Sequence, residues 1–218
     1  MLSKTILEKI YTERFNETSA YRLKVWVILN RYFFSKYIDK KSTVLDLGAG
    51  YGEFINTVDA SKKYAMDLNP ETMAHLLPKV NGLSQDCSQP WKIGEPLDVV
   101  FSSNFLEHLE SKNLLIETLK NAHRALKPGG KIVLVGPNIR YTNGAYWDFL
   151  DHHIPLTEKS LQEALTLVGF KVEHSVDRFL PYTMQDKREA PLFLIRLYLA
   201  LPFIWRFFGQ QFLVVARK

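Results

Sequence analysis

A short apolar run that leads straight into three glycines is the feature that most constrains this chain of 218 residues. Residues 42–47 predict a buried strand, and Gly48, Gly50 and Gly52 predict a tight turn into a helix, where a ligand can lie against the main chain. A plain structural bend is the alternative. Dinucleotide sites place their third glycine at the sixth position of such a loop, where this chain has Glu53. Because a carboxylate repels a pyrophosphate, the loop favours a zwitterionic ligand without phosphate.

Beyond this turn, short apolar runs alternate with segments of helical periodicity. The alternation favours an α/β fold with a doubly wound, mostly parallel sheet. Asn69, followed by Pro70, is expected to cap a helix, and the segment 127–130 is expected to end another. The expected strands are 42–47, 63–68, 97–102, 131–135, 171–176 and 212–216, and the expected helices include 53–58, 114–126 and 161–168.

The segments near the two ends depart from this alternation. Residues 1–39 contain no proline or glycine and repeat apolar residues at helical intervals, which predicts an N-terminal helical cap with a break at 16–19. The main domain is expected over 40–218. Within it, residues 180–211 are rich in Phe, Leu, Tyr and Trp, and we expect them to form a helical lid before the last strand.

Composition excludes several classes of protein. The one cysteine, Cys87, allows neither an internal disulfide nor a Cys-rich zinc site. The formal net charge is +5, but no run of five like charges occurs, so we expect no DNA partner. Glu8 and Lys9 interrupt the apolar residues of the N-terminus, which argues against a secretion leader and favours a cytoplasmic protein.

Two aspartates follow strands at positions that suit a nucleoside. Asp67 lies 19 residues after Gly48, at the end of the next strand, where its carboxylate can accept hydrogen bonds from two ribose hydroxyls. Asp86 follows a third expected strand and can accept a hydrogen bond from an exocyclic adenine amine. Each has a simpler alternative, since Asp67 also suits a helix start and Asp86 also suits a turn.

In this order, the motifs resemble those of the class I S-adenosylmethionine-dependent methyltransferases, of the small-molecule type that includes the ubiquinone-biosynthesis enzymes. The resemblance covers residues 42–178 and the last strand. It rests on the segments Val44-Leu45-Asp46-Leu47-Gly48-Ala49-Gly50-Tyr51-Gly52, Met66-Asp67-Leu68-Asn69-Pro70, Gln85-Asp86, Phe101-Ser102-Ser103-Asn104-Phe105-Leu106-Glu107-His108-Leu109 and Leu126-Lys127-Pro128-Gly129-Gly130.

This resemblance implies a seven-stranded sheet with a reversed final hairpin, and S-adenosylmethionine as the cofactor. It implies that the methionine end lies over Asp46 and the glycine loop, that Asp67 holds the ribose, and that Leu68 lies against the adenine. Asp86 and the backbone of Cys87 would then receive the adenine amine. The cofactor-binding residues expected in this way are Asp46, Gly48, Ala49, Gly50, Gly52, Asp67, Leu68, Asp86, Cys87, Ser103 and Asn104.

The fourth expected strand ends in Ser103 and Asn104, which the resemblance brings near the amino acid end of the cofactor. Amino-group and nucleic-acid methyltransferases often carry an Asn/Asp-Pro-Pro-aromatic motif here. Its lack disfavours methylation of exocyclic base amines. Glu107 and His108 match the usual helix opening of the family, so His108 is either a structural or a catalytic residue.

The loop after the fifth expected strand holds the densest set of polar and aromatic residues. His152 or His153 is the candidate general base for an alcohol or phenol, with Asp151 to orient it; alternatively, the three residues cap or pack a helix entrance. Adjacent residues rarely converge on one ion, so we expect no metal site there. Arg140 suits an anionic group of a substrate. The expected substrate residues are Arg140, Tyr141, Tyr146 and Trp147.

These features predict methyl transfer from S-adenosylmethionine to a small or lipophilic organic acceptor, at a hydroxyl oxygen, by in-line displacement. A tRNA or protein methyltransferase and an inactive cofactor-binding partner subunit are the alternatives. The oily segment 191–208 favours a lipid-linked acceptor. It does not suit a membrane span, because Arg196 and Arg206 bracket only nine uncharged residues. The segment could instead pack on the sheet, contact a membrane surface or join a homodimer, so monomer and homodimer both stay open.

Overall fold

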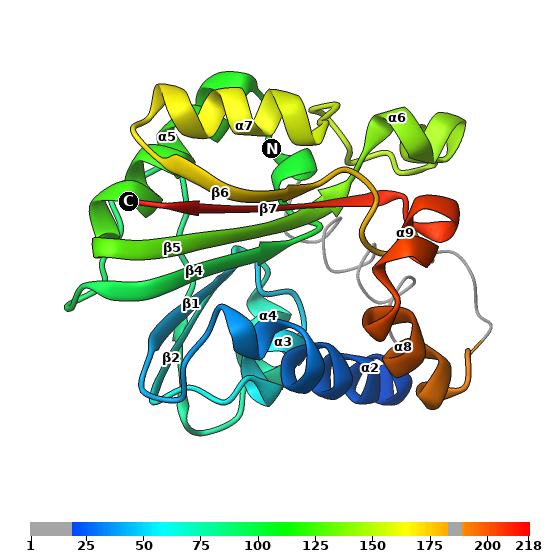
Figure 1. Ribbon diagram of the computed structural model, residues 1–218. Helices are drawn as coiled ribbons and strands as arrows, with labels where there is room; N and C mark the ends of the chain where they lie inside the picture. The colour runs from blue at the N-terminus through cyan, green and yellow to red at the C-terminus, as the bar shows by residue number, and fades with distance from the viewer. Residues whose placement is uncertain (1–18, 183–188) are drawn as a thin grey trace.

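Seven strands form one sheet in the computed structural model, which describes residues 19–182 and 189–218 (Figure 1). The strand order is β3-β2-β1-β4-β5-β7-β6, and β7 runs antiparallel between β5 and β6 while the other neighbours pair in parallel. The predicted α/β fold and the reversed final hairpin are confirmed. The strands are β1 (Thr43–Leu47), β2 (Lys62–Met66), β3 (Val80–Leu83), β4 (Leu97–Ser103), β5 (Leu126–Pro137), β6 (Lys171–Val176) and β7 (Gln211–Arg217).

Helices cover both faces of the sheet (Figure 1). One buried cluster contains Leu119 of α5 and Leu161 of α7, and the other contains Leu29 of α2, Ile55 of α3 and Trp205 of α9. The chain therefore builds three layers with the sheet in the middle. The helices are α2 (Ser19–Tyr32), α3 (Glu53–Thr57), α4 (Pro70–His75), α5 (Lys112–Ala125), α6 (Ile139–Thr142), α7 (Glu158–Leu167), α8 (Leu192–Ala200) and α9 (Pro202–Phe208).

The strands at the centre of the sheet are apolar because both of their faces are covered. Every residue of β1 is buried; Leu45 and Leu47 belong to the cluster beneath α5 and α7, and Val44 belongs to the cluster on the other face. This alternation follows from the two-residue period of a strand. Because β1 and β4 are parallel neighbours, their carboxyl ends lie side by side at the same end of this buried part of the sheet.

Side chains fix where several helices begin. Asn69 accepts a hydrogen bond from the backbone N–H of Glu71, with Pro70 in the first turn, so the predicted cap of α4 is confirmed. Ser111 caps α5 in the same way, and Thr157 begins α7 with a reciprocal bond to Ser160. These local signals position the loops that precede each helix.

The largest departure from the predicted elements is the length of β5. The expected strand covered 131–135, whereas β5 begins at Leu126, which pairs with Leu97 of β4. The pairing of β4 with β5 changes register between Leu97 and Val99, and Val99 pairs with Lys131. Residues 127–130 therefore form an irregularity within β5. Gly129 allows this because it adopts a φ of +77°.

Both end segments are partly described. Of the expected cap 1–39, the structure contains α2 and a short 3₁₀ helix at Phe34–Lys36, while residues 1–18 and the expected break at 16–19, apart from residue 19, lie outside the described residues. The insertion 180–211 contains α8 and α9, and its residues 183–188 also lie outside. The division into cap, main domain and lid stays a prediction. Among the described helices, none has the length and apolar character needed to cross a membrane.

Candidate functional site

The glycine loop lies at the carboxyl end of β1, where its main chain passes close to Phe105, which follows β4. Gly48 has a φ of +71°, and a Cβ atom there would lie 2.1 Å from Cγ of Phe105. Gly50 and Gly52 also have positive φ values. Ser102 of β4 donates a hydrogen bond to the carbonyl of Leu47 at 2.8 Å, which joins the ends of the two strands. Phe105 therefore packs directly against the backbone at Gly48, where a side chain could not be placed.

Asp67 organises the loop from the end of β2. One carboxylate oxygen, Oδ2, accepts the N–H of Gly50 at 2.8 Å, and Oδ1 accepts the N–H of Asn69 at 2.8 Å. Burial raises the pKa of Asp67, while the N–H groups of Asn69 and Gly50 and the charge of His108 act in the opposite direction. A carboxylate has about four acceptor positions, and the backbone N–H groups of Gly50, Leu68 and Asn69 are partners of this one, so it can hold the loop and still accept a hydroxyl group.

Three buried carboxylates gather around the loop. Burial, followed by the nearby charges of Asp67 and Glu53, raises the pKa of Asp46 well above its usual value. Arg22 of α2 approaches this group and pairs with Glu53 at 2.6 Å. The concentration of acids creates an electrostatic demand for a cationic ligand. Sequence analysis missed Arg22, because nothing in the sequence around it indicates that α2 reaches the loop.

The end of β4 supplies an unsatisfied acceptor. Asn104 adopts a φ of +51°, donates its backbone N–H to Val135 at 3.0 Å, and donates its side-chain amide to Ser103 at 3.1 Å. Its Oδ1 atom is buried and has no hydrogen-bond partner among residues 19–182 and 189–218. Such an atom costs free energy unless a ligand or water donates to it.

The expected adenine contacts are arranged less openly. Asp86 Oδ1 accepts the N–H and the hydroxyl of Ser88, which is the turn geometry that the simpler alternative describes. The carbonyl of Cys87 accepts hydrogen bonds from Trp91 and Asn121. Burial raises the pKa of the Cys87 thiol to about 11, so it remains a neutral, packed group.

The acceptor side is built around a histidine that was only a secondary candidate. His108 Nδ1 lies 3.2 Å from Oδ2 of Asp151 and 3.0 Å from its carbonyl oxygen. Asp151 therefore faces His108, a partner that was not among those expected for it. The two segments that supply this pair are 43 residues apart.

The two histidines of the loop have different surroundings. His152 is buried against the rings of Tyr146, Phe149 and His108, at centroid distances of 4.6, 4.9 and 4.9 Å. His153 is exposed, and its backbone N–H donates to the carbonyl of Glu107 at 2.8 Å. Of the two, His152 belongs to the same cluster as His108.

Electrostatics mark this cluster as unusual. Burial raises the pKa of Glu107 to about 7, although His108 opposes the change. Burial lowers the pKa of His108, but the hydrogen bond with Asp151 and the charge of Glu107 more than offset it, so the pKa is raised. Glu107, His108 and His152 each bring a potential ligand atom to within 4.8 Å of the others, although only His152 was in the group for which a metal was considered.

The four expected substrate residues differ in burial and in their partners. Arg140 pairs with Glu158 at 3.2 Å, and the hydroxyl of Tyr141 donates to Asp177 at 2.5 Å, so both have protein partners. The structure thus uses these polar groups to fix the loop. Tyr146 is fully buried with its hydroxyl on the carbonyl of Ile154, whereas Trp147 is exposed.

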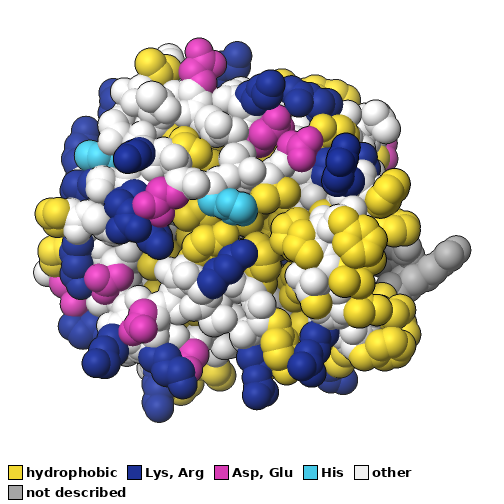
Figure 2. Space-filling model, in the orientation of Figure 1, with side chains coloured by type: hydrophobic (Ala, Val, Ile, Leu, Met, Phe, Trp, Pro, Cys, Tyr) yellow, Lys and Arg dark blue, Asp and Glu magenta, His cyan; other side chains and the backbone are white. Residues whose placement is uncertain are grey.

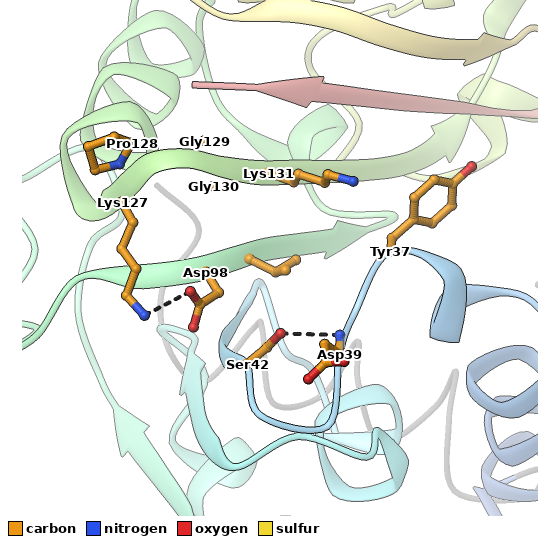
Figure 3. A pocket seen from close by; sticks show the side chains of 10 residues that line it. Tyr37, Asp39, Ser42, Asp98, Lys127, Pro128, Gly129, Gly130 and Lys131 are labelled. Carbon is orange, nitrogen blue, oxygen red and sulfur yellow. Dashed lines mark hydrogen bonds and ion pairs between the residues drawn. The ribbon is translucent and has the colours of Figure 1, made fainter.

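A separate depression lies at the other ends of the strands, away from the glycine loop (Figure 3). Tyr37 and Ser42 line it together with Asp98 and the turn 127–131, and Asp98 pairs with Lys127 at 2.7 Å. These residues stand at the amino ends of β1 and β4. In parallel sheets of this kind ligands bind at the carboxyl ends, so the depression is not part of the candidate site.

Known proteins share both the sequence pattern and the fold. A family described as a methyltransferase domain matches residues 20–175. An uncharacterised methyltransferase-like protein of Schizosaccharomyces pombe is 30% identical over 130 residues, which are 56% of this chain and 44% of that protein. The chain therefore spans less than half the length of this curated relative.

Solved structures agree on the fold. A methyltransferase from Archaeoglobus fulgidus that depends on S-adenosylmethionine has a TM-score of 0.61 and 24% identity, over 90% of this chain and 94% of that one. The N-methyltransferase NodS of Bradyrhizobium japonicum, solved with S-adenosylhomocysteine, has a TM-score of 0.59 and 15% identity, over 93% and 88%. At these identities the likeness concerns the fold alone.

A sheet of this order, with a glycine loop and an acid after β2, defines the class I fold of S-adenosylmethionine-dependent methyltransferases. The chain belongs to the methyltransferase domain family, and solved proteins of the same fold include one that depends on S-adenosylmethionine. Its likeness to the ubiquinone-biosynthesis type stays a prediction.

The residues at this edge fit that cofactor. A sulfonium and an ammonium group answer the demand of Asp46, Glu53 and Asp67 for positive charge. The buried Oδ1 of Asn104 lacks a donor, which an ammonium group would supply. Gly48, Gly50 and Gly52 carry no side chain that could separate a ligand from the backbone of the loop.

Proposed function

We propose that the chain transfers the methyl group of S-adenosylmethionine to a hydroxyl oxygen of a small or lipid-linked acceptor. The observation that carries the proposal is the His108–Asp151 pair, next to the cofactor edge. When bound, the cofactor supplies an electrophilic methyl group on a sulfonium. A hydroxyl acceptor must lose a proton as it attacks, and a half-buried histidine held by a carboxylate is suited to take it.

Residues from five segments would hold the cofactor. The backbone of the glycine loop and the side chain of Asp46 would face the methionine end, and Asp67 would accept the ribose hydroxyls. Asn104, with Ser103, would receive the ammonium group. Arg22, which now pairs with Glu53, would face the methionine carboxylate. Leu68, Asp86 and the backbone of Cys87 would surround the adenine.

His108 is the base that the geometry favours. Its Nδ1 atom faces Asp151, which directs the lone pair of Nε2 away from that carboxylate and toward an acceptor. The hydroxyl proton would pass to Nε2 as the acceptor oxygen takes the methyl group from sulfur, which would leave a neutral thioether, and the proton would then pass from Nε2 to solvent. Asp151 acts as a positioning residue because it raises the pKa of His108 and fixes the ring. His152 is the second candidate and His153 the third.

An apolar acceptor is supported by what surrounds the loop of residues 138–153. Phe149 of this loop meets Tyr182 of the insertion with their ring centroids 5.9 Å apart. Gln210 donates to the carbonyl of Tyr141 at 3.1 Å, so the insertion contacts the loop at two places. The acceptor would therefore lie between His108 and aromatic side chains.

Turnover with a panel of phenols, sugars and lipid-linked alcohols tests this function. Mass spectrometry and NMR of the product should place the new methyl group on oxygen. His108→Ala should lose turnover while cofactor binding persists, and His153→Ala should retain it. Asp151→Asn should move the rise of kcat with pH to lower pH, because the pKa of His108 falls. A methyl group found on nitrogen, or full turnover by His108→Ala, would contradict the proposal.

A cofactor-binding protein without methyl transfer is the second candidate. The [4+2]-cyclase SpnF has a TM-score of 0.61 with this chain, so the fold also serves a protein described by another activity. Another structural match comes from a Haloferax volcanii complex that contains the Trm112 methyltransferase activator. Cofactor binding without turnover on any hydroxyl, tRNA or protein acceptor would favour an inactive partner subunit, and turnover on tRNA or protein would replace the acceptor proposed above.

A further inference from the structure

The outer sides of α8 and α9 form an exposed apolar face next to α2. Figure 2 shows hydrophobic side chains gathered on the side of the molecule where Figure 1 places these helices. Their exposed fractions run from 43% to 73%, which is unusual for large apolar side chains in one place. The apolar face comprises Phe193, Leu194, Leu197, Phe203, Phe207 and Phe208.

These two helices are firmly seated, so the exposure is a property of their outer side. Trp205 is buried and packs against Phe33 and Phe179, with ring centroids 5.8 and 5.1 Å away. Its indole N–H donates to the carbonyl of Tyr198, whose hydroxyl donates to Phe179. The inner side thus anchors the pair of helices to the core and leaves the outer side without a protein cover among the described residues.

Positive charge borders the apolar face. Residues 19–36 and 190–208 contain no Asp or Glu and six Lys or Arg residues. Lys24 and Arg31 of α2 and Arg196 and Arg206 of the two later helices are exposed, and the Arg196 guanidinium lies 4.5 Å from the centre of the Tyr32 ring. A second copy of the chain, placed symmetrically on this face, would bring these cations together. An anionic partner matches them instead.

The dimensions of the helices exclude insertion across a bilayer. α8 has nine residues and α9 has seven, so they are about 14 Å and 10 Å long, against a hydrocarbon core of about 30 Å. Helices that are apolar on one side and bordered by Lys and Arg lie in the plane of a membrane interface. We propose that the apolar face docks on an anionic lipid bilayer, with the phenylalanines at the boundary of headgroups and acyl chains and the four exposed cations on lipid phosphates.

Docking would place the lipid surface beside the site. α8 packs on α2, and α2 carries Arg22 to the glycine loop. The insertion that holds the apolar face also contacts the loop of residues 138–153. A bilayer-resident acceptor would have a short path to His108. The docking itself requires no turnover, so its test is independent of the proposed methyl transfer.

Vesicle flotation with the full chain tests the docking surface. The protein should float with phosphatidylcholine vesicles that contain phosphatidylglycerol, several-fold less with phosphatidylcholine alone, and less at high salt. Phe203→Ser with Phe207→Ser should lower the bound fraction roughly tenfold. Leu167→Ser, which removes a 75% exposed side chain from α7, is the matched control and should leave binding unchanged.

A charge-reversed pair separates the electrostatic part. Arg196→Glu with Arg206→Glu should abolish the preference for phosphatidylglycerol, whereas Lys171→Glu on β6 should not. Equal flotation with both vesicle types, no flotation at all, or an unchanged bound fraction for the phenylalanine variant would overturn the proposal. So would sedimentation that shows a dimer in the absence of vesicles, dispersed by the phenylalanine variant. Near-ultraviolet circular dichroism confirms that each variant is folded.

Discussion

The proposed site has a cofactor half, formed by the glycine loop with Asp67, and an acceptor half, formed by the cluster of His108, Asp151 and His152. Different kinds of contact hold the two halves together. In the cofactor half, backbone groups bond at the ends of neighbouring strands, as between the N–H of Gly48 and the carbonyl of Met66. In the acceptor half, side chains from distant segments meet, as His108 and Asp151 do. A backbone framework leaves little freedom to vary, while a cluster of side chains can be exchanged without moving the loop. The first half therefore suits a fixed cofactor, and the second suits an acceptor specific to this chain.

The largest expected effect separates the halves by their chemistry. His108→Ala should lower turnover by roughly 10²–10⁴-fold, the usual contribution of a general base, while the affinity for the cofactor changes by a few-fold at most. Steady-state kinetics beside calorimetric titration measures both. His153→Ala is the control, since its side chain is exposed. Equal losses of turnover and cofactor affinity would show that the two halves are one unit.

A second change addresses the cofactor half alone. Gly48→Ala should abolish cofactor binding and lower the free energy of unfolding by about 2–4 kcal/mol, because the new Cβ would clash with Phe105 at a positive φ. Urea unfolding measures the loss. Gly144→Ala, whose Cβ would meet nothing within 4 Å, should stay within about 0.5 kcal/mol of the wild type. Normal cofactor binding by Gly48→Ala would show that the backbone framework is not needed.

A third prediction concerns pH and the acceptor half. The folded pKa of Glu107 is about 7, above its ordinary 4.5, so the folded state holds a proton that the unfolded state has lost. Its contribution to stability is complete below about pH 4.5 and is lost as pH rises through about 7. Glu107→Gln removes this titration.

The free energy of unfolding of Glu107→Gln, measured relative to the wild type from pH 5 to pH 8, should therefore rise with pH and level off above about 7, a change of order 2 kcal/mol. Urea unfolding at each pH provides the comparison. A difference that stays constant with pH would mean that Glu107 is ionised throughout in the folded state.

The smallest expected effect concerns the insertion helix α8. Tyr198→Phe removes a hydroxyl that donates to the carbonyl of Phe179 at 2.6 Å, which should cost about 1 kcal/mol of unfolding free energy. Cofactor affinity should not change. Tyr32→Phe, at an exposed tyrosine, is the control. A loss of cofactor affinity in Tyr198→Phe would mean that α8 also supports the cofactor half of the site.

The cofactor half was largely predictable because its signals are local. The glycine loop, the position of Asp67 at a strand end and the cap at Asn69 each depend on a few consecutive residues, and the structure has all three elements where they were expected. Arg22 was missed because its role depends on how α2 packs against α3. The roles assigned to these residues in cofactor binding stay predictions.

The acceptor half was only partly predictable because its partners are distant in sequence. Asp151 was expected to orient His152 or His153, and its contact with His108 was not foreseen, because it depends on how the segment after β4 packs on the loop after α6. Arg140 and Tyr141 were expected to face a substrate, but Glu158 and Asp177 engage them. Only the packing of elements decides such pairs, and spacing does not reveal them.

Calorimetric titration of the protein with S-adenosylmethionine tests the central claim most directly. We expect a dissociation constant of micromolar order, about 8 kcal/mol of binding free energy, and a loss of roughly tenfold or more in Asp67→Ala. Asp59→Ala, at an exposed surface aspartate, should bind like the wild type. Absence of binding by the folded wild type, or equal affinity in Asp67→Ala, would contradict the account.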